Sequence, residues 1–124
     1  MGLKRRHRVR DKERFRQVRQ EGTSYSHPLM VLCCLDNGEA SSHCGFTVSK
    51  RIGSAVERTR ARRRMREAVR LLWDGIAPGW DLVWIARPGI NDAEFTELQD
   101  ACARLLRRAR LLQAPVGASG VTGK

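Results

Sequence analysis

The residues most able to bind a ligand lie between positions 45 and 70, a stretch with nine basic residues and only two acidic ones. Apolar residues recur among them at helical spacing, which predicts a folded amphipathic helix. Glu67 can pair with Arg63, but most of the arginines have no acidic neighbour. A guanidinium group grips phosphate oxygens in bidentate fashion. The stretch therefore predicts a surface for a polyanion, of which a nucleic-acid backbone is the usual one.

Other chemistry has little support in the sequence. No two of the four cysteines are separated by two residues, and the three histidines do not repeat at zinc-ligand spacing. We expect the cysteines to be reduced thiols that pack as small side chains. Ser49 and Lys50 are adjacent in a predicted strand, so their side chains would point to opposite faces and could not act as nucleophile and base. We expect no catalytic residue and no metal site on this chain.

The helix that carries the arginines is predicted over residues 54–73, with Ser54 as its N-cap. With about 3.6 residues per turn, the apolar side chains between positions 61 and 72 fall in one sector, which would dock on the core. Arg58 and Arg62 lie at the edge of that sector, so their aliphatic stems are expected to cover the core rim while the charged groups emerge.

Elements on both sides of this helix complete the predicted domain. In chain order they are a helix over residues 12–20, strands over 29–35 and 44–49, the arginine helix, a strand over 81–86 and a last helix that ends at 112. The first helix has Asp11 as its N-cap and Phe15 and Val18 on one face. Asn91 and Glu94 have the spacing of a capping box before the last helix.

This order predicts an α+β fold, a two-layer α-β sandwich with its helices packed on one face of the sheet. The order is α-β-β-(β)-α-β-α, where the bracketed strand is optional. Residues 1–112 would form a single RNA-binding domain, residues 1–10 a basic, flexible N-terminus and residues 113–124 a disordered tail. The chain has no apolar run near the ~20 residues of a membrane span and no apolar segment of a secretory signal. We expect a cytoplasmic protein.

The charge pattern does not by itself identify the nucleic acid. The net charge is +11, and 18 of the 24 lysines and arginines lie in residues 4–19 and 50–70. A purely solvated face would normally mix charges of both signs. Helix-turn-helix proteins that bind DNA are built mainly from helices, whereas this chain has an apolar sheet, and it offers few Asn or Gln side chains to read adenine. Structured RNA is therefore the favoured ligand.

The central stretch resembles the signature of the bacterial ribonuclease P protein subunit, in which S-V-S-K-K leads through a glycine into A-V-x-R-N-R-x-K-R-x-x-R-E. The matching residues are Val48, Ser49, Lys50, Arg51, Gly53, Ala55, Val56, Arg58, Arg60, Arg62, Arg63, Arg66 and Glu67. The resemblance covers about residues 3–112. It departs from the family pattern at Thr59, where the family has Asn, and at Arg62, where it has Lys. Some members also carry a second aromatic residue at the position of Arg19.

The resemblance implies a left-handed β-α-β crossover through the arginine helix, a rare connection that sequence periodicity alone would not suggest. It also implies a function: removal of the 5′ leader of precursor tRNA by a ribonucleoprotein endoribonuclease. The catalytic groups and most of the Mg²⁺ would belong to the RNA subunit and the substrate. The protein would bind that RNA and the leader, with no membrane and no obligate protein partner.

The resemblance implies two sets of RNA-binding residues. The set expected to contact the RNA subunit is Lys50, Arg51, Arg58, Arg60, Arg62, Arg63 and Arg66. The set expected in a cleft for the leader is Phe15, Arg19 and Cys33. Phe15 has an alternative role in ordinary core packing against the sheet. Two other functions fit the charge. One is a structural RNA-binding protein of the ribosomal or RNA-chaperone type, and the other is a stand-alone nuclease that cleaves RNA without a catalytic RNA.

Overall fold

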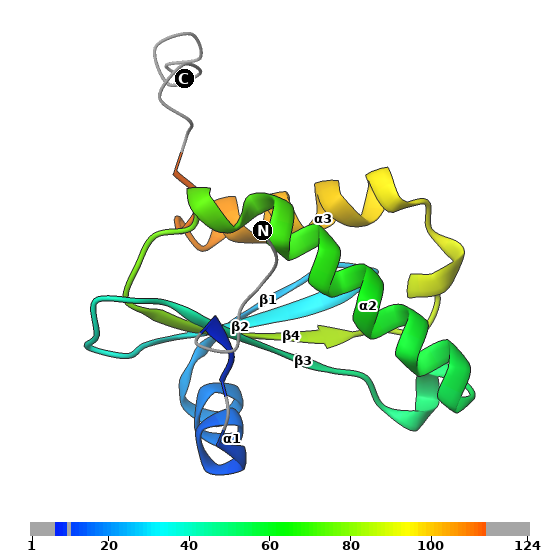
Figure 1. Cartoon of the computed structure of the whole chain (residues 1–124), viewed down its shortest axis with the longest axis horizontal. Coiled ribbons are helices and arrows are strands. Elements are labelled where there is room, and N and C mark those ends of the chain that lie inside the picture. Colours follow the sequence, from blue (N-terminus) through cyan, green and yellow to red (C-terminus); the bar gives the residue numbers. More distant parts are fainter. Residues whose placement is uncertain (1–6, 10, 114–124) are drawn as a thin grey trace, which may run out of the picture.

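The computed structural model describes residues 7–9 and 11–113, which form a four-stranded sheet with helices on both faces (Figure 1). The elements in chain order are α1 (Lys12–Glu21), β1 (Thr23–Ser26), β2 (Met30–Asp36), β3 (His43–Thr47), η2 (Lys50–Ile52), α2 (Ala55–Leu72), η3 (Trp73–Gly75), β4 (Trp80–Ala86), η4 (Ile90–Asp92) and α3 (Phe95–Arg108). The predicted mixed α+β class is confirmed. Residues 1–6, 10 and 114–124 lie outside the described residues, so the flexible N-terminus and the disordered tail stay predictions there. Residues 7–9 are described, and the backbone N–H of the buried Val9 donates to the oxygen of Cys44 at 2.9 Å, so this part of the N-terminus lies against β3.

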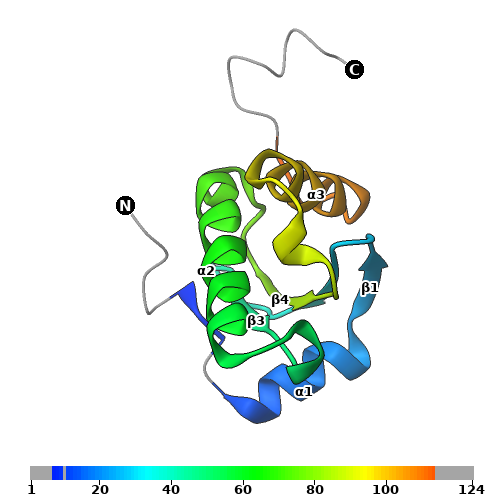
Figure 2. The same ribbon diagram turned by 90° about the vertical axis from the view of Figure 1, so that its right-hand side faces the viewer.

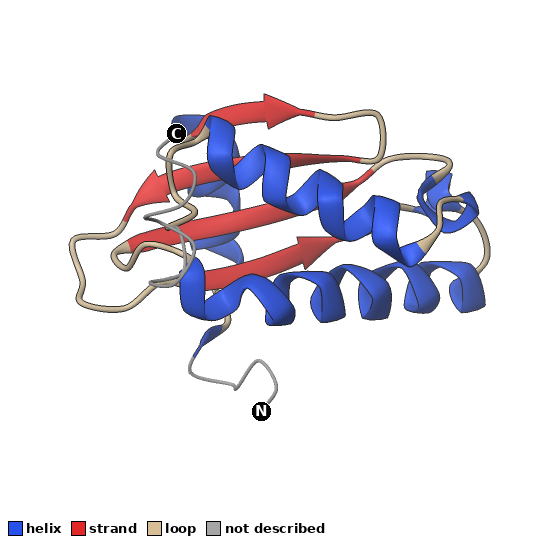
Figure 3. Cartoon of the chain, turned by 90° about the horizontal axis from the view of Figure 1, so that it is seen from above, coloured by secondary structure: helices blue, strands red, loops and turns tan. Residues whose placement is uncertain are grey.

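The strands lie in the order β1-β2-β4-β3 (Figure 3). β4 pairs antiparallel with β2 and parallel with β3, where His43 is opposite Asp81. α2 therefore connects two adjacent parallel strands. The left-handed sense of this connection stays a prediction. A third strand does precede α2, but it is β1, which comes before β2, whereas the optional strand was predicted after the strand over 44–49. The sequence of β1, TSYS, is too short and polar to have been predicted from periodicity.

The main core lies between one face of the sheet and the helices α2 and α3 (Figure 2). α2 contributes Ala61 and Met65 to it, and α3 contributes Leu98 and Leu105, all of them fully buried. Trp84 of the central strand β4 packs in the same cluster. Since side chains alternate along a strand, the next residues of β2 and β4 face the other way.

The opposite face of the sheet is covered in part by α1 (Figure 1). Val18 is 0% exposed and packs on Cys33 and Val83, with Phe15 beside them. The expectation that all helices would pack on one face is therefore wrong. The reason is that β2 and β4 are apolar at almost every position, so both of their faces need cover.

Helix ends explain two further differences from the predicted elements. Ser54 caps α2 as predicted, and Glu57 completes a capping box with it. The capping box predicted at Asn91 and Glu94 is wrong. Glu94 is itself the N-cap of α3 and forms a capping box with Glu97, while Asn91 lies in η4. α3 ends at Arg108 and not at 112, because the chain turns where Arg110 adopts a left-handed conformation with φ of 62°.

Candidate nucleic-acid interface

The arginines of α2 differ in their surroundings, and a first group, Arg58 and Arg64, is held by backbone carbonyls of the protein itself. Arg58 donates from Nη1 to the oxygen of Gly53 at 2.8 Å. Arg64 donates from Nη1 to the oxygen of Ile90 at 2.9 Å and from Nη2 to that of Ala93. Arg64 therefore fastens α2 to η4 and to the segment before α3. Arg58, which was predicted to bind RNA, has part of its guanidinium committed to the turn that starts α2.

The second group faces solvent along one stripe of α2. Val56, Thr59, Arg60 and Arg63 follow the spacing i, i+3, i+4 and i+7, and they line a shallow hollow of about 470 Å³. Both arginines are exposed, and Val56 is 78% exposed. Among the described residues, no carboxylate forms an ion pair with either arginine. This stripe combines two available guanidinium groups with a hydroxyl and an apolar side chain.

The acidic side chains on α2 do not neutralise that stripe. Glu67 forms its ion pair with Arg70, so its predicted pairing with Arg63 is wrong. A hydrogen bond from Arg70 lowers the pKa of Glu67 below its usual value. Glu57 is committed to the N-cap, where it accepts a hydrogen bond from the backbone N–H of Ser54 at 2.8 Å.

Lys50 and Arg51 lie in η2, between β3 and α2, and both are exposed. Ser49 caps this turn by accepting a hydrogen bond from the backbone N–H of Arg51 at 3.3 Å. The two cations therefore lie on a 3-10 turn beyond the end of a strand that is shorter than predicted. They continue the basic surface past the N-terminus of α2.

A small pocket at the edge of β3 joins the two predicted sets of residues. It has a volume of about 120 Å³ and is lined by Arg8, Val9, Phe15, Cys44, Gly45, Phe46, Arg62 and Arg66. The ring of Phe15 lies directly against Gly45, where an added Cβ would be 2.3 Å from the ring carbon Cζ. Glycine at this position is thus what lets the ring approach β3. Phe15 both packs on the sheet and lines the pocket.

Cations crowd the same pocket. Arg66 lies over the ring of Phe46 at 5.9 Å, in a cation–π contact. Burial lowers the pKa of Arg66, and the nearby charges of Arg8 and Arg62 lower it further. This crowding of like charges is relieved when an anion binds between them. Phe46 and Arg8 were not predicted, since neither belongs to the arginine helix or to a sequence motif.

A second, wider hollow lies on the other side of Phe15, along α1. It has a volume of about 570 Å³ and is lined by Lys12, Phe15, Arg16, Arg19 and Gln20. Arg19 thus lines this hollow together with Phe15 and two further cations, Lys12 and Arg16, and its role in leader binding stays a prediction. Cys33 is different: its side chain is 3% exposed and lies under Val18, beneath this surface. A role for Cys33 in leader binding stays a prediction.

The sheet face next to α1 remains partly open. Val31, Thr47 and Ile85 lie on this face and are only half-buried. They extend the surface of Phe15 along the sheet towards η2. An aromatic ring beside an open apolar strip and a row of cations can hold a single-stranded nucleic acid by stacking and by phosphate contacts.

Within residues 7–9 and 11–113, no three His, Cys, Asp or Glu side chains come together to hold a metal ion. The same residues include no helix long and apolar enough to cross a membrane. Burial raises the pKa of Cys34, Cys44 and Cys102 to about 12, so these thiols stay protonated and unreactive at neutral pH.

The sequence is similar to known proteins over most of its length. Residues 3–110 match the family model for ribonuclease P. The chain belongs to the ribonuclease P protein family. It is 48% identical to the ribonuclease P protein component of Chloroflexus aurantiacus over 114 residues, which are 91% of this chain and 84% of that protein. It is 46% identical to that of Roseiflexus castenholzii, over 92% of this chain and 94% of the other.

Solved structures of the ribonuclease P family have the same fold. The ribonuclease P protein of Thermotoga maritima is 28% identical and superposes with a TM-score of 0.74, covering 82% of this chain and 96% of its own. The protein from Staphylococcus aureus superposes with a TM-score of 0.78 at 24% identity, over 86% of this chain and 98% of its own, and that likeness concerns the fold alone.

Proposed function

We propose that this chain is the protein subunit of a cytoplasmic ribonuclease P, a ribonucleoprotein that removes the 5′ leader of precursor tRNA to give the mature 5′ end. The chain would bind the catalytic RNA subunit and the leader. The catalytic groups would lie on the RNA, and Mg²⁺ would be held mainly by RNA phosphates. Membership of the family supports this function. The described carboxylates, histidines and thiols offer no cluster that would fit a metal ion on the protein.

The RNA subunit would lie along α2 and η2. Arg60 and Arg63 are the best-placed phosphate ligands, since both guanidinium groups are exposed and no described carboxylate pairs with them. The remaining proposed contacts are Lys50, Arg51, Arg58, Arg62 and Arg66. Of these, Arg58 would act partly through the turn that it holds at Gly53.

The leader would lie across Phe15 and the open sheet face. The observation that carries this proposal is the pocket at the edge of β3, where Phe15 of α1 and Arg62 and Arg66 of α2 line one space. An RNA strand that reaches Phe15 would therefore be within reach of the helix that binds the RNA subunit. Stacking of a base on the ring would contribute about 1–3 kcal/mol.

The test is cleavage of precursor tRNA by a bacterial ribonuclease P RNA at low Mg²⁺ concentration, with and without this protein. We expect the protein to increase the rate of leader removal, and the increase to shrink as the leader is shortened. The protein alone should not cleave the substrate. Tight RNA binding without any gain in cleavage would contradict the proposal and favour a structural RNA-binding protein.

A further inference from the structure

Helix α1 carries Phe15 but has few apolar contacts with the sheet. Val18 is the one fully buried side chain of α1, and Phe15 is half-buried beside it. The other side chains of α1 are charged or polar, and most of them are exposed. Burial of so little apolar surface fixes a ten-residue helix weakly. Another interaction is needed to hold the ring of Phe15 against Gly45.

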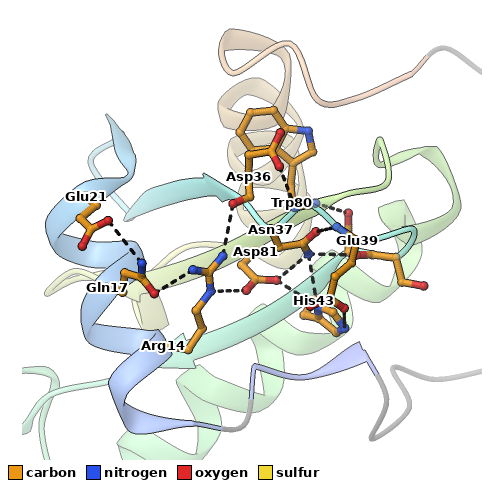
Figure 4. Close-up of polar contacts among 12 residues, drawn as sticks. Arg14, Gln17, Glu21, Asp36, Asn37, Glu39, His43, Trp80 and Asp81 are labelled. Atoms are coloured by element: carbon orange, nitrogen blue, oxygen red, sulfur yellow. Dashed lines mark hydrogen bonds and ion pairs between the residues drawn. The ribbon is translucent and has the colours of Figure 1, made fainter.

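A buried carboxylate on the central strand supplies that interaction. Asp81 of β4 is 5% exposed, and its Oδ2 accepts a hydrogen bond from Nε of Arg14 at 2.6 Å (Figure 4). Arg14 directly precedes Phe15 in α1. The ion pair therefore joins the middle of the sheet to the helical turn that carries the aromatic ring.

The second oxygen of Asp81 is fixed from the other side. Its Oδ1 lies 2.9 Å from Nδ2 of Asn37 and 2.9 Å from Nδ1 of His43 (Figure 4). Burial alone would raise the pKa of Asp81, but hydrogen bonds from Asn37, Arg14 and His43 outweigh it, and the pKa is lowered. The carboxylate is thus charged and held in one orientation, with Oδ2 aimed at α1.

Arg14 is occupied by the protein at all three of its nitrogens. Besides the bond from Nε to Asp81, Nη1 donates to Oε1 of Gln17 at 2.9 Å and Nη2 donates to the oxygen of Asp36 at 3.3 Å. This separates Arg14 from Arg16 and Arg19, which line the hollow along α1. Its position suits an anchor within the fold better than a contact with RNA phosphates.

We infer that Arg14 and Asp81 are positioning residues, which set α1 on the sheet and so hold Phe15 in place for the RNA leader. The inference rests on the proposed function. Neither residue touches the leader. Loss of the ion pair leaves α1 attached through the apolar contacts of Val18 and Phe15, and these are too few to keep the ring of Phe15 in a fixed place at the edge of β3. A phosphate-binding arginine would instead act directly on the RNA.

The test compares Arg14→Gln, Asp81→Asn and the double variant with the wild type in the reconstituted ribonucleoprotein. The measured quantity is the affinity for precursor tRNA with a long leader, divided by the affinity for tRNA without a leader. We expect each single variant to lower this ratio by about tenfold, which is about 1.4 kcal/mol. The double variant should lose little more, because both changes break the same pair.

The matched control is Arg104→Gln. It removes the same charge and breaks an exposed ion pair with Asp100 on α3, at 2.7 Å, and we expect it to leave the ratio unchanged. Hydrogen exchange of the amides in α1 should become faster in Arg14→Gln while those of β2 and β4 stay protected. Arg14→Lys, which keeps the charge, should recover part of the ratio.

Two results would overturn the inference. The first is an affinity ratio in Arg14→Gln as high as in the wild type, and the second is a loss of affinity for the RNA subunit as large as the loss of affinity for precursor tRNA with a leader. The second result would mean that the whole domain is disturbed or that Arg14 binds RNA. If the wild type itself binds precursor tRNA no better with a leader than without one, the proposed function fails. Hydrogen exchange of α1 then still tests the anchor, since unchanged exchange in Arg14→Gln would refute it.

Discussion

Arg60, Arg63 and Arg64 are close neighbours in the sequence, yet their environments differ completely. Arg60 and Arg63 are exposed on the outer stripe of α2, while Arg64, one turn after Arg60, donates to two backbone carbonyls of the segment before α3. A count of basic residues treats them alike. The fold assigns the first two to a surface that can bind phosphate and the third to the packing of α2.

The exposed pair should control the salt dependence of RNA binding. Each phosphate contact that is lost lowers the slope of log affinity against log salt concentration, so Arg60→Ala and Arg63→Ala should each lower it by roughly 0.7–0.9. The measurement is RNA-subunit binding at a series of salt concentrations. Arg104→Ala serves as the control, because Arg104 lies on α3 in an ion pair with Asp100. An unchanged slope in both α2 variants would contradict their assignment.

The close approach of Phe15 to Gly45 gives a second prediction at the residue scale. Phe15→Leu should weaken leader binding by about 1–3 kcal/mol through lost stacking. Gly45→Ala should cause part of the same loss without removing the ring, because the new Cβ would lie 2.3 Å from Cζ and push the ring away. Binding of precursor tRNA with and without its leader measures both effects. Equal losses with leaderless tRNA would show that the ring does not act on the leader.

At the scale of the elements, α2 is attached to the segment before α3 by polar contacts from both directions. Arg64 donates to the carbonyls of Ile90 and Ala93, and Asn91 donates from Nδ2 to the carbonyl of Glu57 at 2.9 Å. These bonds hold the arginine helix at a fixed angle to η4. They explain why Asn91 does not cap α3, as its spacing to Glu94 had indicated.

Arg64→Ala should therefore reduce stability and leave the phosphate contacts intact. Loss of hydrogen bonds from a charged donor costs about 2 kcal/mol, and we expect a fall of that size in the free energy of unfolding, measured by urea denaturation. Arg60→Ala is the matched control, with little expected change in stability. If Arg64→Ala instead lowered the salt slope as much as Arg60→Ala, Arg64 would have to be counted among the RNA ligands.

The sequence predicted those elements that have strong periodicity. The bounds of α1, β2, α2 and β4 are within one or two residues of prediction. β2, α2 and β4 have a regular apolar pattern, and α1, which has few apolar residues, has a clear N-cap at Asp11 and a glycine directly after its end. β1 could not be predicted, since it owes its conformation to pairing with β2 and not to its own residues. The pocket at the edge of β3 could not be predicted either. It depends on how α1, β3 and α2 meet in space, and Phe46 and Arg8 enter it only through that arrangement.

At the scale of the whole molecule, one buried carboxylate links acid stability to the fold. The pKa of Asp81 is lowered, so its contribution to stability is fully present above the unfolded-state pKa of about 3.9 and is lost as the pH falls through its lower folded-state pKa. Asp81→Asn should therefore destabilise the protein most at neutral pH. The difference from the wild type in the free energy of unfolding should shrink below about pH 4.

Thermal or urea unfolding across this pH range measures the difference. Asp100→Asn is the control, because Asp100 is exposed and its ion pair with Arg104 is solvent-screened. A difference for Asp81→Asn that stays constant down to the lowest pH would mean that the charge of Asp81 does not stabilise the fold.

The place of β4 in the sheet has a consequence for how the chain folds as it is made. β2 and β3 follow one another in the sequence, yet they are not hydrogen-bonded to each other, because β4 lies between them. Until residues 80–86 leave the ribosome, β2 and β3 lack the strand that joins them. The helices on either face of the sheet then have no complete sheet to pack against. We therefore expect the nascent chain to stay open through synthesis of the arginine helix, and to close in one cooperative step once its central strand has been made.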